Sequence, residues 1–220
     1  MKRSTPLTAL ALASALALAG CGTGGDSPGD ASAPATPTAT AGDRTGTAGA
    51  TTGAASGEPI SEEHNDDDVM FAQMMIPHHQ QAVDMSETLL GKDDIPADVR
   101  AFAQKVVDAQ GPEIERMNQM LQTWEAPMPA EDSTSMDHGT GGMMSEEDMG
   151  MLNDAQGTAA ARLYLEQMTV HHEGAVEMAR DQVEQGQNPQ AVALAQDVIT
   201  AQEAEITEME EMRQELPTDS

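Results

Sequence analysis

Two His–His dipeptides, His78–His79 and His171–His172, are the residues of this chain best suited to chemistry. Each has a methionine three residues before its first histidine, so that the motif reads Met-x-x-His where a di-iron helix bundle would carry Glu-x-x-His. Thioether and imidazole together form a soft ligand set that favours Cu(I) or Ag(I), whereas a hard di-iron site needs carboxylates. The repeated dipeptides therefore predict a site for a soft metal ion.

Two glutamates and two further methionines recur with the same duplicated spacing. Glu113 and Glu205 each follow a glutamine by three residues and precede a methionine by four. Helical periodicity places these glutamates on otherwise apolar faces, where they can orient imidazole rings or bind Cu(II) directly. The methionines, Met117 and Met209, are further candidate ligands, although methionine at helical spacing usually packs in a core.

A glycine-rich segment adds a third group of soft side chains, namely Met136, His138, Met143 and Met144. It is similar to the methionine- and histidine-rich tracts of exported proteins that handle copper and silver. Packing in a core is not expected for methionines in such a loop. We therefore interpret these four residues as candidates for copper capture, the alternative being a linker with incidental methionines.

The folded part of the chain is a duplication. Residues 71–85 match residues 164–178, and residues 101–117 match residues 193–209, with Gly and Pro between the two segments of each half. Each segment has apolar residues at helical spacing, which predicts two helical hairpins that pack into an all-α four-helix bundle over residues 61–216. A connection rich in Met, His and Gly near residues 125–150 joins the hairpins.

The N-terminal region has the pattern of an export signal. Residues 1–20 combine a basic start with a short Ala/Leu-rich run, and Cys21 follows Leu-Ala-Gly, which resembles a bacterial lipobox. We expect lipidation of Cys21 after cleavage, and a disordered Gly/Ala/Thr/Pro tether over residues 21–60. The alternative is an ordinary signal peptide with an incidental cysteine.

Composition excludes several classes of protein. The chain has 38 acidic and 10 basic residues, a formal net charge of −28, which excludes nucleic acid as a partner. Its one cysteine excludes a disulfide framework and a CxxC zinc site. Only 2% of its residues are aromatic, which disfavours an all-β fold.

The duplicated Met-x-x-His-His motifs, each followed by Gln-x-x-Glu-Ile-x-x-Met, resemble the family known as domain of unknown function 305. The resemblance extends over residues 66–213, and Thr169 departs from the Ile that is usual there. It implies a ferritin-like four-helix bundle and, for some members, an exported copper-binding protein. It also implies a set of metal ligands: Met75, His78, His79, Met85, Met168, His171, His172 and Met178.

These observations predict an extracytoplasmic lipoprotein, anchored to the bacterial cell membrane at Cys21, that binds copper for sequestration, tolerance or transfer. Cu(I) is the favoured ion, and Cu(II) and Ag(I) are further candidate ions. Catalysis is not expected. Two other hypotheses stay open: a ferritin-like redox metalloenzyme acting as an oxidase or reductase, and a metal-free tethered interaction module.

Overall fold

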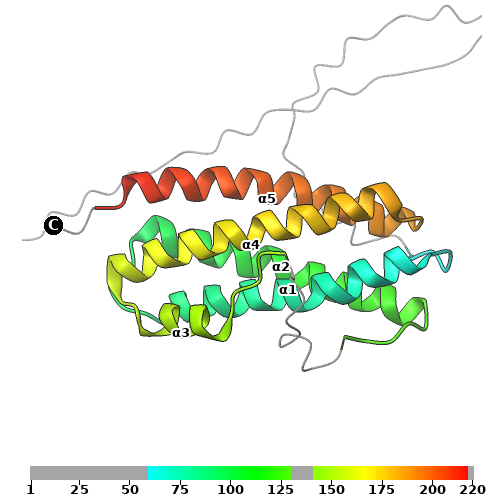
Figure 1. The fold of residues 1–220 in the computed structure, drawn as a ribbon, viewed down its shortest axis with the longest axis horizontal. Helices are drawn as coiled ribbons and strands as arrows, with labels where there is room; N and C mark the ends of the chain where they lie inside the picture. The colour runs from blue at the N-terminus through cyan, green and yellow to red at the C-terminus, as the bar shows by residue number, and fades with distance from the viewer. Residues whose placement is uncertain (1–58, 130–140, 218–220) are drawn as a thin grey trace, which may run out of the picture. The chain divides into compact units, whose positions relative to one another are not determined.

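The computed structural model describes residues 59–129 and 141–217, which contain five helices and no strand. Four are long: α1 (Asp66–Leu90), α2 (Ala97–Thr123), α4 (Gly157–Gln185) and α5 (Pro189–Glu215); α3 (Glu146–Asp154) is short. The long helices lie alongside one another as a bundle (Figure 1). The predicted all-α helical bundle is therefore confirmed.

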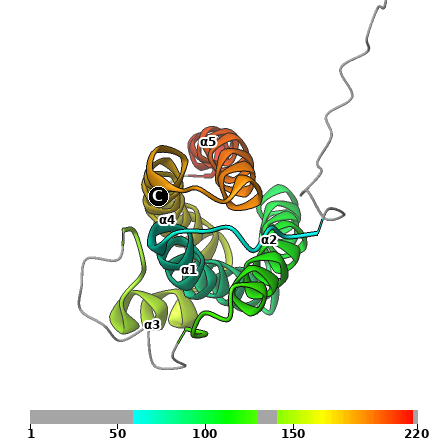
Figure 2. The same cartoon turned by 90° about the vertical axis from the view of Figure 1, so that its right-hand side faces the viewer.

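The two sequence repeats form the two halves of the bundle. Helix α1 packs on α2, α4 packs on α5, and the halves meet mainly where α1 contacts α4. The end-on view shows the four long helices around a common core, with α3 outside them (Figure 2). The duplication of the sequence thus becomes two similar hairpins packed together.

Local signals explain where the helices begin. Asn65 and Asp68 form a capping box at the start of α1, each side chain accepting a hydrogen bond from the other's backbone N–H. The fully buried Asp68 carboxylate also accepts hydrogen bonds from the Gln182 side chain (2.6 Å) and the Asn188 backbone N–H (2.9 Å). One carboxylate therefore joins the start of α1 to the α4–α5 turn.

Helix α3 corrects the predicted connection between the halves. The connection was expected to extend to about residue 150, yet Glu146–Asp154 is helical. Ser145 and Asp148 form a second capping box, and Leu152 is fully buried in the core. A capping box followed by an apolar residue is a local helix signal that the surrounding glycines obscured.

The predicted signal peptide, Cys21 and nearly all of the tether lie outside the described residues, as do Met136 and His138. No helix in the described part of the chain is both long enough and apolar enough to cross a membrane.

Candidate metal-binding site

The centre of the α1–α4 contact is a pair of imidazoles from equivalent positions of the two halves. The ring centroids of His78 and His171 lie 3.7 Å apart, and each side chain is only 1% exposed. The neighbours in sequence, His79 and His172, are fully buried. We call these four residues the histidine cluster. Both predicted His–His pairs therefore lie together inside the bundle.

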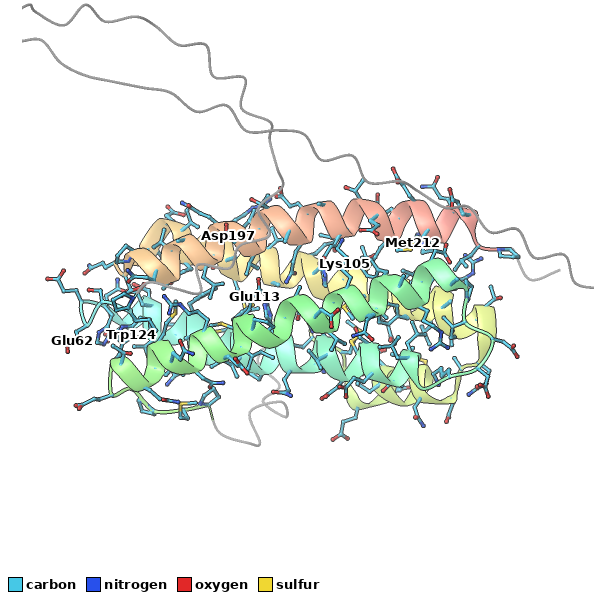
Figure 3. All side chains as sticks on the ribbon, turned by 180° about the vertical axis from the view of Figure 1, so that it is seen from behind. Glu62, Lys105, Glu113, Trp124, Asp197 and Met212 are labelled. Carbon is cyan, nitrogen blue, oxygen red and sulfur yellow. The ribbon has the colours of Figure 1, made fainter. Side chains whose placement is uncertain are left out.

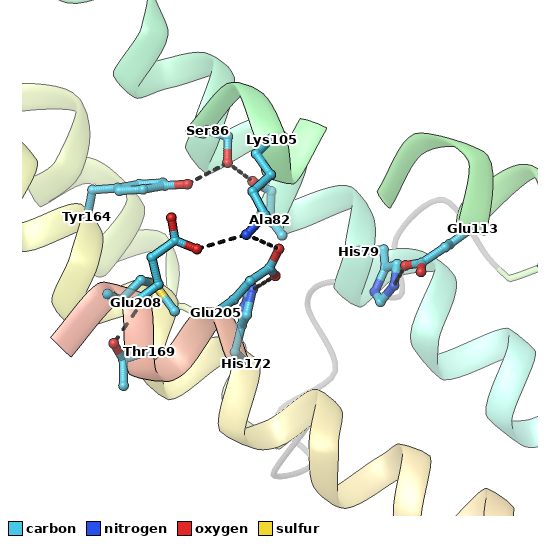
Figure 4. A network of polar contacts seen from close by, with 11 residues as sticks. His79, Ala82, Ser86, Lys105, Glu113, Tyr164, Thr169, His172, Glu205 and Glu208 are labelled. Carbon is cyan, nitrogen blue, oxygen red and sulfur yellow. Dashed lines mark hydrogen bonds and ion pairs between the residues drawn. The ribbon is translucent and has the colours of Figure 1, made fainter. Parts of the chain in front are cut away.

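Each outer histidine is hydrogen-bonded to the glutamate of its own half. The Nε2 atom of His79 lies 2.9 Å from Glu113 Oε2, and Nε2 of His172 lies 3.0 Å from Glu205 Oε2 (Figure 4). A carboxylate only accepts hydrogen bonds, so each Nε2 donates its proton. The Nδ1 atom of each ring has no hydrogen-bond partner. This arrangement leaves a nitrogen lone pair available for a metal.

The central histidines are neutral. Burial is the main cause that lowers the pKa of His78 to about 3, and repulsion from His79 adds to it. Burial is also the main cause that lowers the pKa of His171 well below its usual value, and repulsion from His78 adds to it. His78 Nε2 donates to the Gly141 carbonyl at 3.0 Å, which leaves its Nδ1 unpartnered, and neither ring nitrogen of His171 has a well-formed hydrogen bond. Both rings can therefore bind a cation at neutral pH without first losing a proton.

A close backbone contact positions the Gly141 carbonyl over the cluster. A β-carbon on Gly174 of α4 would overlap the Gly141 oxygen, so only glycine permits this approach. The amide of Gln81 donates to the Met144 carbonyl and accepts from its backbone N–H, at 2.9 and 2.7 Å. Residues 141–144 are therefore fixed against α1 and α4.

Most of the unsatisfied buried polar atoms belong to the repeated His and Gln positions of the two halves. Nine buried side-chain nitrogen or oxygen atoms lack a hydrogen-bond partner in the described structure, and seven of them belong to the histidine cluster and to Gln110 and Gln202. Each such atom destabilises the fold unless something binds it. A bound cation would satisfy several of these lone pairs at once.

A lysine side chain lies beside the Glu205 carboxylate. Lys105 lies 3.5 Å from Glu205 and 2.8 Å from Glu208, at the boundary of α2 and α5 (Figure 3). Burial alone would raise the pKa of Glu205, but the hydrogen bond from His172 and the charge of Lys105 outweigh it and hold that pKa below its usual range. Glu205 is therefore a carboxylate at neutral pH. Nothing in the sequence pattern singled out Lys105.

The predicted methionines fall into two core groups that mix the halves. Met85, Met168 and Met209 belong to one core cluster, whereas Met75 and Met117 belong to the other, with the half-buried Met178 packed against it. The methionines before and after one His–His pair thus belong to different core clusters. Each group combines thioethers from α1 or α2 with thioethers from α4 or α5.

The loop methionines behave differently from expectation. Met144 is half-buried and packs against the core cluster that contains Met85, Met168 and Met209, as does Met149 of α3. The expectation that such methionines do not pack in a core is therefore wrong for Met144. Met143 is half-buried as well. Residues 143–144 therefore form part of the folded domain rather than a free capture loop.

Carboxylates and imidazoles alone do not complete a site. Within residues 59–129 and 141–217, no three side chains among His, Cys, Asp and Glu are grouped so that they could hold a metal ion. The soft ligand set of the sequence motif adds thioether sulfur to the imidazoles as a possible donor.

Comparison with known proteins decides the family. The model of the family described as domain of unknown function (DUF305) matches residues 68–213. The chain belongs to this family. Two similar DUF305 structures are a fragment from Deinococcus radiodurans (31% identity, TM-score 0.63, covering 69% of this chain and 98% of that one) and a candidate secreted protein from Streptomyces coelicolor (34%, 0.62, covering 68% and 93%).

A third relative of this DUF305 chain has been solved with metal. CopM in its Cu(II)-bound form is 32% identical, with a TM-score of 0.60, covering 67% of this chain and 96% of CopM. CopM has also been solved in Cu(I)- and Ag-bound forms. No curated protein matches the chain.

Proposed function

We propose that this DUF305 protein binds Cu(I), and also Ag(I), through the histidine cluster and buried core methionines, and that it sequesters or transfers copper outside the cell membrane. The candidate methionines are the five that are fully buried, namely Met75, Met85, Met117, Met168 and Met209. The observation that carries the proposal is the set of buried imidazole nitrogens without partners, at positions that two halves of the chain share. The metal-bound forms of CopM support the same chemistry.

Imidazole Nδ1 atoms and thioether sulfurs are the proposed ligands. Glu113 and Glu205 act through the rings: by accepting the Nε2 proton, each fixes the tautomer and orientation of its histidine and raises the basicity of Nδ1. This assigns the two glutamates an orienting role for Cu(I). A soft, largely buried ligand set favours storage or transfer over turnover at an open metal centre.

Metal titration of the purified protein tests this function. Cu(I) should bind far more tightly than Zn(II) or Fe(II), and replacing all four histidines of the cluster by Gln should abolish the tight phase. Gln retains hydrogen-bonding capacity, so circular dichroism should show an intact helical fold. The matched control is His64→Gln, because His64 is exposed and stacks on Trp124 away from the cluster.

Two results would contradict the proposal. Tight Cu(I) binding that survives in the four-histidine variant but is lost when Met136–Met144 are deleted would make the bundle only a scaffold. Fe(II) binding as tight as Cu(I) binding, accompanied by oxygen consumption, would favour the redox-enzyme hypothesis instead.

The lipid anchor is a separate part of the proposal. Cys21 is the proposed lipidation site, which would hold the acidic domain at the outer face of the cell membrane. Cys21→Ser should release the protein into the aqueous fraction, with Ser27→Ala in the tether as the matched control. Unchanged membrane association of Cys21→Ser would refute lipid anchoring.

A further inference from the structure

A surface groove lies between the start of α1 and the end of α4, apart from the histidine cluster. It has a volume of about 270 Å³ and is lined by Met70, Met74 and Met178 around Phe71, with Asp67 and Asp181 among its other lining residues. Met70 and Met74 are 51% and 38% exposed, and Met178 is half-buried. Three thioethers thus border one small cavity that solvent can reach.

The duplication provides an internal comparison for this groove. The positions equivalent to Met70 and Met74 in the other half are Leu163 and Gln167, and the position equivalent to Gln185, which also lines the groove, is Lys92. Gln167 donates a hydrogen bond to the Asp148 carbonyl, and Lys92 donates to the Asn153 carbonyl. Both acceptors belong to α3, so α3 covers the equivalent groove.

Helix α3 also fills the equivalent groove with apolar side chains. Leu152 is fully buried in the core cluster on that side, and Met149 packs against the same cluster. Figure 1 shows α3 beside the end of the bundle where α4 begins; at the opposite end, where α1 begins, residues 59–129 and 141–217 supply no corresponding helix. The two grooves therefore differ: one is closed by protein, and the other is open and has methionine where its counterpart has leucine and glutamine.

Simple apolar packing does not explain the methionines of the open groove, because two of them are exposed to water. Thioether sulfur is a weak ligand for hard ions but a good one for Cu(I) and Ag(I). The Asp67 and Asp181 carboxylates at the groove, on a chain of net charge −28, attract cations to it. The groove thus combines soft donors, access for solvent and a favourable electrostatic field.

We propose that the open groove is a second, surface site for a soft monovalent cation, Cu(I) or Ag(I), with the thioethers of Met70, Met74 and Met178 as ligands. It is independent of the histidine cluster. Because it is exposed, it exchanges its ion with solvent faster than the buried cluster does. Met178, predicted from the sequence as a ligand beside the histidines, belongs to this site.

The test uses Ag(I), which needs no reductant, and the purified protein labelled with ¹³C at the methionine methyl groups. One equivalent of Ag(I) should bind at the groove and shift the methyl resonances of Met70, Met74 and Met178. The triple variant Met70→Leu, Met74→Leu and Met178→Leu should lose that equivalent, since Leu conserves volume but has no sulfur. The matched control is Met128→Leu with Met151→Leu, because these methionines are 48% and 47% exposed but do not line the groove.

The same titration in the variant with all four cluster histidines replaced by Gln separates this proposal from the proposed function. The triple Met→Leu substitution should remove one equivalent of bound Ag(I) both from the wild-type protein and from the variant that lacks the four histidines. The groove site is refuted if the three methyl resonances do not shift, if the triple variant binds as much Ag(I) as its parent, or if the control loses as much.

Discussion

The two central histidines should make the metal-free protein sensitive to acid. The pKa of His78 is about 3 in the folded chain and about 6.5 when exposed to water, so between these values the unfolded chain binds a proton that the folded chain does not. The free energy of unfolding therefore rises with pH in this window, and stability is lost as pH falls from 6.5 towards 3.

The magnitude follows from proton linkage. Each pH unit within the window corresponds to about 1.4 kcal/mol per imidazole. Between pH 7 and pH 5, His78 alone should cost the folded state about 2 kcal/mol. The carboxylates of this acidic chain titrate nearby, so their contribution must be removed by comparison with a variant that lacks only this imidazole.

Urea unfolding of the metal-free protein and of His78→Gln, followed by circular dichroism at pH 7, 6, 5 and 4, measures the effect. The stability of wild type relative to His78→Gln should fall by about 2 kcal/mol between pH 7 and pH 5. Parallel profiles for wild type and His78→Gln would show that His78 protonates equally well in the folded chain, and would refute the reasoning.

Two other predictions test how the cluster is held. Gly174→Ala places a β-carbon against the Gly141 oxygen, so it should displace residues 141–142 and lower stability by about 1–3 kcal/mol. The Nε2–H signal of His78 in NMR should report the loss of its hydrogen bond to Gly141, and an unchanged signal would contradict this prediction. Leu152→Ala should cost about 2–5 kcal/mol of stability and speed amide hydrogen exchange in α3. Exchange that rises equally in α2 would show that α3 does not open on its own.

The sequence was sufficient for the architecture because the signals were local and repeated. The helical spacing of residues 101–117 predicted one inward-facing stripe, and Phe102, Val106 and Gln110 on that stripe of α2 are all buried. Glu113, on the same stripe, is only half-buried, although its carboxylate accepts a hydrogen bond from the fully buried His79. Periodicity identifies which face of a helix points inward, but it does not determine how deep each side chain lies.

The contacts that build the candidate site were harder to predict because they join distant parts of the chain. The packing of α1 against α4 determines that His78 faces His171. It also determines how the methionines of the two halves divide into two groups. The Gly141–Gly174 contact depends on one missing β-carbon in one repeat, where the other repeat has Gln81. No histidine is adjacent to Met70 or Met74 in the sequence, so the Met-x-x-His-His motif did not include these groove methionines.

The facing of His78 and His171 has a consequence for a chain cut in half. A hairpin of residues 59–129 alone would expose to water the face of α1 that α4 covers, including Met75 and the His78 ring. Two copies related by a two-fold axis could cover that face for each other, with His78 of each copy against the same residue of the other. The melting temperature of such a fragment should then rise with its own concentration, whereas that of the complete chain should not.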